Sequence, residues 1–336
     1  MRSVEQRRQG TSDASRQSGV RVSVVVCTRN RASRLVACLD RIAASGGGSQ
    51  ASWELLVVDN GSTDDSLSVL DRWGRANTCA FRVVPEPRPG LSRARNAGVR
   101  AATGELIAFV DDDCLVERDW MERLLAAYLV QPIPDLVGGR VDLHDPADAA
   151  ISIRPFDDSS DVADLTAVST RLIGCNFSVR AHALRSIGLF DERLGAGSSS
   201  RSGEDLDLFY RLLKAGMRLR YDGSVRVRHA HGRRLESDLA DLRLGYLRGR
   251  AAVFAKHSLM GDVEMLKHLY WELRRLVSAK QGGDGGALEA RARLKAVCAL
   301  VTGALLMMPR IWRIWRIGRW SAVAAPYERN ALWRLK

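Results

Sequence analysis

Residues 106–113 read LIAFVDDD, five apolar residues that run directly into three aspartates. A short apolar run of this kind is typical of a strand buried on both faces of a parallel sheet. Strand and helix patterns alternate before it, in the order strand 20–27, helix 32–44, strand 53–59, helix 62–73, strand 81–84, helix 91–102 and strand 106–110. This alternation predicts an α/β domain with a mainly parallel central sheet flanked by helices.

The pattern continues less regularly up to residue 232. We expect Ser62 or Thr63 to cap the helix at 62–73, and Gly216 to occupy the C′ position after a helix at 204–215. The remaining elements are predicted as a helix at 117–130, an irregular acidic stretch at 142–170, a strand at 174–179, a helix at 181–187, a Gly/Ser-rich loop at 195–203, and strands at 218–221 and 225–228.

Polar side chains follow three of the predicted strands at the point where each ends. They form the clusters 28–30 (TRN), 59–60 (DN) and 111–113 (DDD). In open α/β sheets, ligands bind beyond the carboxyl ends of the strands. The coincidence of the three clusters therefore predicts one ligand site at this edge of the sheet.

The aspartate triplet is the clearest candidate for a metal site. Three carboxylates on one turn repel each other and raise one another's pKa, and a hard divalent cation removes this penalty. Mg²⁺ and Mn²⁺ prefer oxygen ligands and commonly bridge carboxylates to substrate phosphates. The alternative is a solvated acidic turn without a metal ion.

The net charge of +12 is unevenly distributed. Residues 1–231 carry 31 Lys and Arg against 30 Asp and Glu, whereas residues 232–336 carry 20 against 9. A nucleic-acid binder with a uniformly basic surface would not show this distribution, so no nucleic-acid partner is expected.

The six scattered cysteines predict reduced thiols in a cytoplasmic protein. Residues 1–19 are polar, without an apolar signal segment, and are predicted to be disordered.

Five segments, taken in order, resemble glycosyltransferase family 2. They are VVVCTRN (24–30), VVDNGSTD (57–64), GLSRARNAG (90–98), TGELIAFVDDD (103–113) and GEDLDL (203–208). The resemblance implies the GT-A fold over residues 20–232, with a nucleotide-binding part at about 20–115 and an acceptor part at about 116–232. It leaves residues 233–336 as a basic helical C-terminal extension. Many relatives have proline where this chain has Cys27, so we expect a slightly altered turn there.

The resemblance implies a metal-dependent enzyme that moves a sugar from a nucleoside-diphosphate sugar to an acceptor hydroxyl. UDP is the commonest donor nucleotide of such enzymes, and Mn²⁺ or Mg²⁺ would neutralise the leaving diphosphate. Thr28 and Asp59 match positions of the nucleobase pocket, Arg95 a residue near the diphosphate, Asp111 the ribose ligand and Asp113 the metal ligand. The donor-binding set is Thr28, Asn30, Asp59, Arg95, Asp111 and Asp112, and the metal set is Asp113, Asp111, His229 and His231.

Two further acids begin the helix predicted at 204–215. Carboxylates are favoured at a helix N-terminus, so Glu204 and Asp205 have a simple explanation as capping residues. In the family's pattern the second acid is the general base, which would take the acceptor's proton and lead to inversion at the anomeric carbon. Asp205 would fill this role and Glu204 would help to hold the acceptor, while the loop at 195–203 would close over both substrates.

His229 and His231 end the last predicted strand, and residues two apart on a strand share one face. Several GT-A enzymes take a metal ligand from a histidine at this point. We favour His229, with His231 as the alternative, against a purely structural role for both.

The C-terminal third is predicted to be amphipathic helix at 235–275, with a break at 281–286 and an uncharged stretch at 296–308. Thirteen apolar residues are too few to span a bilayer, which needs about 20. Trp and Arg alternate in RIWRIWRIGRW (310–320), as in interfacial segments. We expect peripheral contact with the inner face of the plasma membrane through residues 285–325, and a lipid-linked acceptor. The alternative is a helical hairpin packed on the head or on a second subunit, as in a homodimer.

Two other enzyme classes lack their sequence signals. There is no Gly-rich, Lys-bearing phosphate loop of a nucleotidyltransferase after the first strand, and no G-x-G-x-x-G of a NAD-dependent enzyme. A catalytically inactive GT-A protein acting as a nucleotide-binding or membrane scaffold is the remaining alternative. The sequence motifs do not distinguish among the sugars, nucleotides and acceptors that such a transferase could use.

Overall fold

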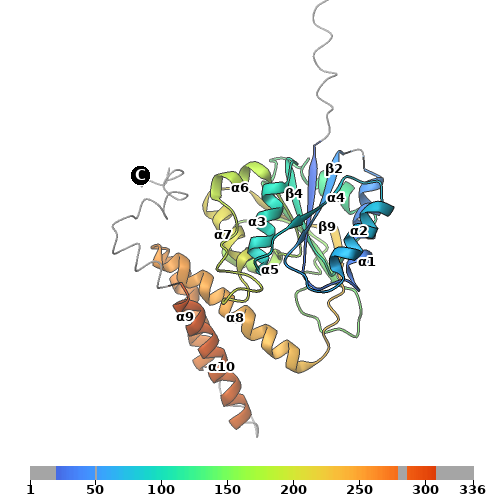
Figure 1. Ribbon diagram of the computed structural model, residues 1–336. Coiled ribbons are helices and arrows are strands. Elements are labelled where there is room, and N and C mark those ends of the chain that lie inside the picture. Colours follow the sequence, from blue (N-terminus) through green and yellow to red (C-terminus); the bar gives the residue numbers. More distant parts are fainter. Residues whose placement is uncertain (1–19, 50, 279–285, 308–336) are drawn as a thin grey trace, which may run out of the picture.

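The computed structural model describes residues 20–49, 51–278 and 286–307, and shows a sheet covered by helices with a helical extension beside it (Figure 1). The predictions for residues 1–19, for 281–285 and for the Trp/Arg segment at 310–320 lie outside these residues. The sheet has nine strands in the order β3-β2-β1-β4-β8-β6-β9-β5, and β7 pairs with β9.

The first half of the sheet is parallel. Its strands are β1 (Val22–Thr28), β2 (Trp53–Asp59), β3 (Phe81–Pro85) and β4 (Leu106–Asp111). All four occur where the apolar runs predict them. Thr28 pairs with Asp59, and Cys27 pairs with Asp111, so the carboxyl ends of β1, β2 and β4 lie side by side. The three polar clusters therefore meet at one edge, as the sequence predicts.

The second half of the sheet is mixed. β8 (Asn176–Arg180) is antiparallel to β4 and to β6 (Leu136–Leu143), while β9 (Leu219–His229) is parallel to β6. β5 (Cys114–Val116) and β7 (Ser159–Val162) are antiparallel to β9. Only β5, β7 and β8 oppose the common direction, so six of the nine strands run the same way, in agreement with the predicted α/β class.

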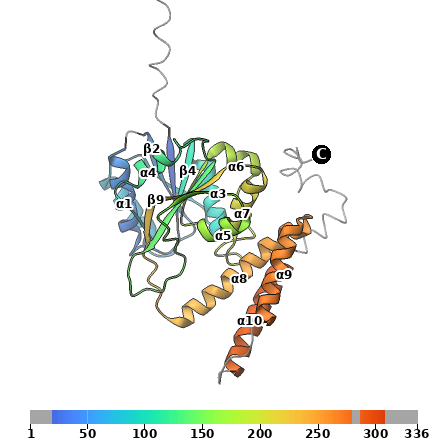
Figure 2. The ribbon, with the colours of Figure 1, turned by 180° about the vertical axis from the view of Figure 1, so that it is seen from behind.

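Helices cover both faces of the sheet (Figure 2). Alternate residues of β1 point to opposite faces of the sheet. Val24 packs in one core cluster with Leu35 of the first helical layer, and Val25 packs in another with Ala94 of the second. The first layer is α1 (Leu35–Gly47), α2 (Ser66–Ala76) and α4 (Trp120–Ala127); the second is α3 (Leu91–Ala101), α5 (Leu165–Arg171), α6 (Ala181–Ile187) and α7 (Glu204–Lys214).

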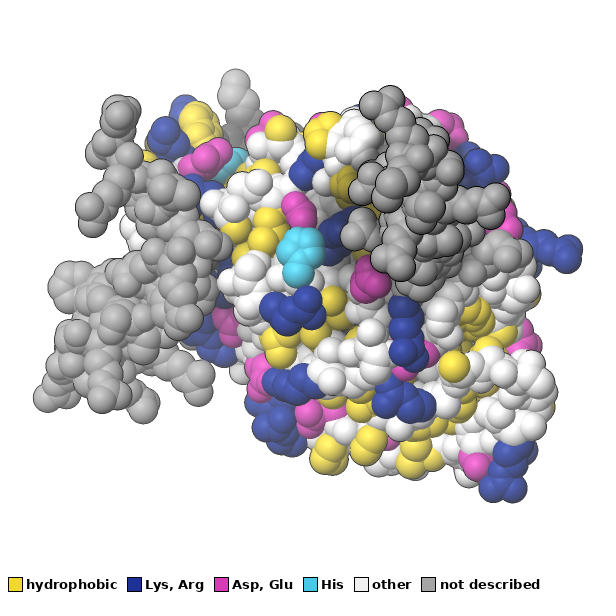
Figure 3. Space-filling view, turned by 90° about the horizontal axis from the view of Figure 1, so that it is seen from above, with side chains coloured by type: hydrophobic (Ala, Val, Ile, Leu, Met, Phe, Trp, Pro, Cys, Tyr) yellow, Lys and Arg dark blue, Asp and Glu magenta, His cyan; other side chains and the backbone are white. Residues whose placement is uncertain are grey.

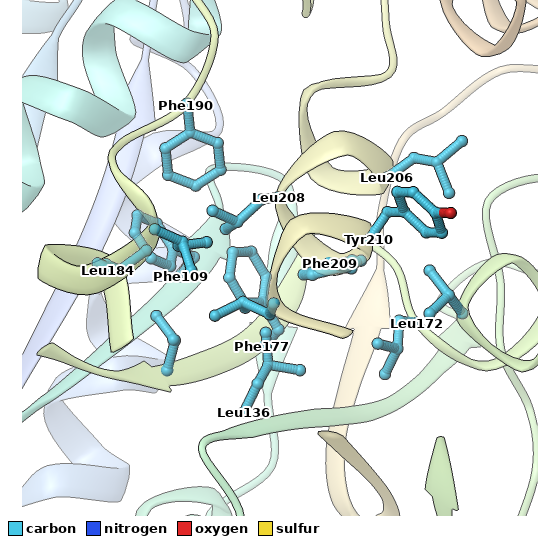
Figure 4. Packing of buried hydrophobic residues seen from close by; sticks show 14 of the residues in the cluster. Phe109, Leu136, Leu172, Phe177, Leu184, Phe190, Leu206, Leu208, Phe209 and Tyr210 are labelled. Atoms are coloured by element: carbon cyan, nitrogen blue, oxygen red, sulfur yellow. The ribbon is translucent and has the colours of Figure 1, made fainter. Parts of the chain in front are cut away.

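Aromatic rings fill the core beneath the second layer (Figure 4). Phe109 of β4 stacks on Phe177 of β8 with 4.7 Å between ring centroids, and Phe209 of α7 meets Phe177 edge-on at 5.0 Å. Phe190 contacts Phe109 edge-on at 5.5 Å. Aromatic pairs in these geometries add stabilisation beyond the area they bury. This core therefore fixes α7, which carries Asp205, onto the strand that carries the aspartate triplet.

Several predicted boundaries were wrong. Helix α2 begins at Ser66 with Asp65 before it, not at Ser62 or Thr63, because the backbone amides of those two residues bond to the Asp59 and Asn30 side chains instead. The stretch predicted as irregular at 142–170 contains β7 and α5, and the two strands predicted at 218–221 and 225–228 form one strand, β9. The strands β7 and β9 are decided by pairing with distant strands, which local sequence patterns do not report.

Three helices form the C-terminal extension, α8 (Glu236–Leu259), α9 (Val263–Ser278) and α10 (Gly286–Leu305). The single helix predicted at 235–275 was wrong, because the chain turns at Gly261 with φ +91°. Leu300, in the segment predicted to be uncharged and interfacial, is buried in a cluster with Leu247 and Ala251 of α8. None of the helices in the described ranges has the length and apolar character needed to cross a bilayer.

The amino-terminal ends of the parallel strands lie on the face of the molecule opposite their carboxyl ends (Figure 1). On this face basic and acidic side chains are interspersed, without a large area of one sign (Figure 3). All six cysteines are free thiols. The three polar clusters lie at the opposite edge of the sheet, at the carboxyl ends of the parallel strands.

The buried carboxylate of Glu54 offers a test of how the parallel strands are tied together. It accepts from the Ser23 hydroxyl at 2.7 Å, the Thr103 amide at 2.9 Å and Arg82 Nη2 at 2.8 Å. Burial by itself would raise the pKa of Glu54, but these hydrogen bonds outweigh it and lower the pKa to about 2. The ionised carboxylate is therefore stabilised by folding.

We expect Glu54→Gln to lower the free energy of unfolding at pH 7 by about 1–3 kcal/mol, since it weakens hydrogen bonds to a charged group. The pKa of an unfolded glutamate is about 4.3, so this contribution is complete above about pH 5 and is lost as the pH falls toward 2. Urea unfolding at several pH values measures it, with the exposed Glu105→Gln as control. A difference that stays constant down to pH 2 would contradict the assignment.

Candidate active site

A cavity of about 640 Å³ opens at the carboxyl ends of β1 and β4. Its walls come from segments far apart in the sequence: the loop after β1, the turn after β4, the loop before α7, the end of β9 and one face of α8. Among its lining residues are Thr28, Arg31, Asn60, Arg95, Asp111, Asp112, Asp113, Arg154, Glu204, Asp205, His229, Arg233 and Tyr246. The cavity thus brings together most of the residues that the sequence singles out.

Each aspartate of the triplet has a different partner. Arg95 Nη2 donates to Asp111 Oδ1 at 3.2 Å, and the Thr28 hydroxyl donates to Asp112 Oδ2 at 2.7 Å. Asp113 Oδ1 lies 3.2 Å from Nε2 of His229. This division follows from the tight turn between β4 and β5, which points successive side chains in different directions. The three carboxylates are therefore not equivalent, although the sequence presents them as one run.

The electrostatic environment separates the aspartates further. Burial raises the pKa of Asp111, and burial together with the Asp113 charge raises the pKa of Asp112 to about 7. Asp113 is also buried, but the hydrogen bond from His229 outweighs burial and lowers its pKa to about 2. The pKa of His229 in turn rises to about 9, because the bond to Asp113 outweighs the effect of burial. Asp113 is therefore ionised at neutral pH.

The donor set at this corner fits a hard divalent cation. One ligand atom each of Asp113, Cys114 and His229 lies within 4.8 Å of the others. The hydrogen bond with Cys175 and burial raise the pKa of the Cys114 thiol well above its ordinary value, so this thiol stays protonated. The carboxylate of Asp113 and the imidazole of His229 remain. They would suit Mn²⁺ or Mg²⁺ once the imidazole releases its proton to solvent, with substrate oxygens as further ligands.

The two histidines are placed differently. The rings of His229 and His231 lie 5.0 Å apart, but His231 has both nitrogens engaged: Nδ1 accepts from the Arg233 amide at 2.9 Å, and Nε2 bonds to the Ala149 carbonyl at 3.1 Å. Nδ1 of His229 is buried and has no hydrogen-bond partner among the described residues. The geometry therefore offers His229, rather than His231, as the imidazole available to a cation.

The loops after β1 and β2 are bonded to each other. Asn30, in a left-handed conformation with φ 55°, accepts from the Thr63 amide at 2.7 Å, and its own amide donates to the Ser62 hydroxyl at 3.0 Å. Asp59 accepts from the Ser62 amide at 3.3 Å. The structure places Thr28 in the cavity wall. Asn30, in the loop after β1, and Asp59, the last residue of β2, are not among the lining residues.

Asn60 fixes a third loop to this pair. Its side chain donates to the carbonyls of Glu86 and Arg88 at 2.9 Å each and accepts from the Gly90 amide at 2.8 Å. Gly90 directly precedes α3, which carries Arg95. The sequence places Asn60 in a strand-end cluster but gives no signal for this bridging role, because its partners are backbone groups.

Arg95 is the centre of the buried polar network. Its side chain is 2% exposed and donates to Glu204 Oε1 at 2.8 Å, to the Gly174 carbonyl at 2.8 Å and to Asp111. The sequence-based prediction places Arg95 near the diphosphate. In the structure its charge is already shared between two carboxylates of the chain.

The acids at the start of α7 also differ from each other. Gly203 precedes them in a left-handed conformation, φ 96°, which turns the chain into the helix. Glu204 is buried against Arg95, and burial together with Asp205 raises the pKa of Glu204 to about 7. Asp205 is partly exposed in the cavity wall, and its Oδ2 accepts from the Gly174 amide at 2.8 Å. Both acids line the cavity, but Glu204 is buried and only Asp205 is partly exposed.

A second buried network holds α7 from behind, and the sequence analysis missed it. Asp207 is fully buried and accepts from Lys256 Nζ at 2.7 Å, His257 Nε2 at 2.9 Å and Arg211 Nε at 2.9 Å. Lys256 also lies 2.9 Å from Asp191. The acid-rich GEDLDL run offers a signal for Asp207, but nothing in the sequence of α8 marks Lys256 as its partner.

Comparison with known proteins identifies the family. A protein-family model, Glycosyl transferase family 2, matches residues 23–187. The pre-mycofactocin glycosyltransferase of Mycobacterium tuberculosis is 34% identical over 248 residues, which cover 70% of this chain and 47% of that protein. The glycosyltransferase Mb0553 of Mycobacterium bovis, described as uncharacterized, is 32% identical over 206 residues, 60% of this chain and 83% of that protein.

Solved structures extend the likeness to the fold. The mannosyltransferase PcManGT of Pyrobaculum calidifontis matches with a TM-score of 0.57 and 21% identity, covering 94% of this chain and 84% of that one. TarS 1–349 of S. aureus matches with a TM-score of 0.53 and 15% identity, covering 89% and 92%. The chain spans about half the length of the pre-mycofactocin glycosyltransferase. From its sequence relatives, its sheet and its site, the chain belongs to glycosyl transferase family 2 and has the GT-A fold.

Proposed function

We propose that this chain transfers a sugar from a nucleoside-diphosphate sugar to an acceptor hydroxyl, depends on Mn²⁺ or Mg²⁺, and inverts the anomeric carbon. One observation carries the proposal: Asp113, His229 and Asp205 line a single cavity, although they come from three separate elements. A cation site and a carboxylate facing the same space are what donor activation and proton removal require.

The donor end of the cavity is the corner of Asp113 and His229. A cation bound there would neutralise charge on the leaving diphosphate, which is worth several kcal/mol in such reactions. Asp111 would bind the ribose, and Thr28 and Asp59 the base. PcManGT was solved with GDP-Man and Mn²⁺ and TarS with UDP, which supports a nucleotide-sugar donor here and leaves the nucleotide open between UDP and GDP.

Asp205 would act as the general base. Its Oδ2 is held by the Gly174 amide and the turn of α7, so the carboxylate is oriented before the acceptor arrives. It would take the proton of the acceptor hydroxyl while that oxygen attacks from the face opposite the leaving nucleotide. Glu204, bound to Arg95, would position this turn, and through it the acceptor.

The loop at 195–203 would limit access of water. Gly195, Gly197 and Gly203 adopt positive φ values of 99°, 80° and 96°, and the loop is joined to α3 by the Leu91 amide, which donates to the Ala196 carbonyl at 2.9 Å. A short, glycine-hinged loop over the reacting centre suits a transferase, which must favour the acceptor over water.

We also propose peripheral membrane contact through residues 285–325, which would present a lipid-linked acceptor at the inner leaflet. In support, α9 and α10 expose apolar side chains, namely Leu266, Tyr270, Trp271, Leu294, Val301 and Leu305. Exposed apolar residues next to cationic ones are typical of interfacial segments.

Removing the metal ligand should remove nucleotide binding. We expect UDP or GDP with Mn²⁺ to raise the unfolding temperature of the wild-type chain, since a ligand at 100 times its Kd stabilises by about 2.7 kcal/mol. Asp113→Ala should abolish this rise, whereas Asp65→Ala, an exposed aspartate outside the cavity, should keep it. A full Mn²⁺-dependent rise in Asp113→Ala would contradict the assigned ligand.

Neutralising the base should separate binding from chemistry. We expect Asp205→Asn to bind the nucleotide with Mn²⁺ within about twofold of wild type, but to release nucleoside diphosphate from the donor about 10² to 10⁴ times more slowly. Calorimetry and a coupled diphosphate assay measure the two quantities. Wild-type turnover in Asp205→Asn would exclude it as the base, and binding without turnover in the wild-type chain would favour a nucleotide-binding scaffold.

Membrane contact can be tested without disturbing the contact between α8 and α10. We expect the full chain to sediment with phosphatidylglycerol vesicles and, because Trp anchors at the headgroup level, the Trp312→Ser/Trp315→Ser double variant to sediment several-fold less. Phosphatidylcholine vesicles are the control for the electrostatic part. Equal sedimentation of the two proteins would contradict the proposed interfacial role of this segment.

A further inference from the structure

Helix α8 forms one wall of the active-site cavity. Leu242, Tyr246 and Arg250 line the cavity and are spaced by four residues, which places them on one face of the helix. The Tyr246 hydroxyl lies 2.7 Å from that of Ser152, on the opposite side. These α8 residues lie beyond the family match, which ends at residue 187. A helix of the C-terminal extension thus contributes to a site otherwise built by the α/β domain.

The wall is fixed close to Asp205. A Cβ atom at Gly249 would lie 2.0 Å from Ser202 Oγ, so only glycine allows α8 to approach the loop that leads into α7. Ser202 Oγ donates to the Gly245 carbonyl at 3.0 Å. About two turns beyond Gly249, Lys256 is anchored to Asp207. The distance between this wall and the carboxylate of Asp205 is therefore set by packing.

The cavity is also lined by apolar side chains. Ile151, Val168, Leu172 and Phe209 line it together with Leu242. No cation ligand of the donor site belongs to this group. The end of the cavity next to α8 therefore suits an acceptor with an apolar portion, at a distance from the metal corner.

A positive charge without a counter-charge lies in the same region. Arg154 lines the cavity, and its Nη1 and Nη2 atoms donate to the carbonyls of Ile153 and Ser169 at 2.7 and 3.0 Å. Within the described ranges it has no ion pair, whereas Arg201 pairs with Asp241 and Arg250 pairs with Glu272. Burial lowers the pKa of Arg154 while the Asp205 charge raises it, so the two groups act on each other. A desolvated cation without a carboxylate is costly unless a ligand supplies one.

Arg233 also lacks an ion pair among the described residues, but it belongs to the donor end. Its amide bonds to His231, and its charge acts on the pKa of Asp113. Arg29, which is exposed and follows Thr28, also lines the cavity without an ion pair among the described residues, and it belongs to the donor end as well. Arg154 and Arg233 thus mark two anion-binding positions in one cavity. The donor diphosphate accounts for the position at Arg233 and leaves the one at Arg154 for the acceptor.

We propose that the acceptor carries an anionic group beside an apolar portion, and that Arg154 binds the anion while Leu242 and Tyr246 of α8 contact the apolar portion. The acceptor hydroxyl would then face Asp205. This inference rests on the proposed function, because it takes Asp205 as the base. The acceptor is therefore a hydroxylated amphiphilic anion.

Binding of three matched probes tests this. Hexyl β-D-glucoside, hexyl β-D-glucuronide and hexyl β-D-glucoside 6-phosphate share the sugar ring and chain, and differ in having no charge, a carboxylate or a phosphate. We expect at least one anionic probe to bind the full chain about tenfold more tightly than the neutral probe, through a charge-assisted contact with Arg154. The better of the two anions identifies the charged group.

Two substitutions test whether Arg154 and Leu242 are responsible for the tighter binding of the anionic probe. Arg154→Gln should reduce the preference for the anionic probe to less than about twofold, and Leu242→Glu, at a half-exposed position, should weaken that probe by about tenfold. Arg185→Gln removes an exposed charge outside the cavity and should change nothing. Equal binding of all probes, binding of none, or a preference that survives in Arg154→Gln would overturn the proposal.

Parallel titrations with UDP and Mn²⁺ keep this result apart from the proposed function. Retained nucleotide binding in Arg154→Gln shows that the variant is folded and its donor end intact. If the wild-type chain does not bind the nucleotide, the donor assignment fails, and the preference for anionic probes still decides the assignment of Arg154.

Discussion

The buried guanidinium of Arg95 is the interaction on which the site depends. It lies on α3 and joins Asp111 at the end of β4, Glu204 at the start of α7 and the Gly174 carbonyl before β8. Asp111 and Arg95 belong to the part of the chain that forms the parallel half of the sheet, and Gly174 and Glu204 belong to the part that follows it. A buried cation needs its partners, and losing one would leave an uncompensated charge in the core. One side chain thus holds the two parts in the register that brings Asp113 and Asp205 to the same cavity.

Within this network, the acids of the site differ in pKa and in exposure because their surroundings differ. Asp113 is held ionised by His229, whereas burial raises the pKa of Asp112 and Glu204. Asp205 accepts from the backbone amides of Gly174 and Leu206 and stays partly exposed in the cavity wall. Carboxylates that are equivalent in the sequence therefore differ in charge and exposure, as the roles proposed for them in metal binding, structural support and proton transfer require.

The C-terminal extension has a closer relation to the site than its basic composition suggests. Helix α8 lines the cavity and anchors α7 through Asp207, and α10 packs on the outer side of α8 through Leu300. A change at α9 or α10 would therefore reach the acceptor end through α8. This arrangement gives the extension a direct structural role in the site, in addition to the membrane contact proposed for residues 285–325.

The sequence by itself determined the parallel half of the sheet, its edge of polar residues and the candidate acids, because a buried strand and the polar turn after it are local patterns. It did not determine the single long strand β9, the start of α2 at Ser66 or the helices of the extension, where distant partners or a single turn decide. Only the tertiary structure decided which charge meets which, as in the contact of Arg95 with Glu204, 109 residues away, and of Asp207 with Lys256. Such pairings arise from packing between elements, and an arginine or lysine in a helix carries no mark of its partner.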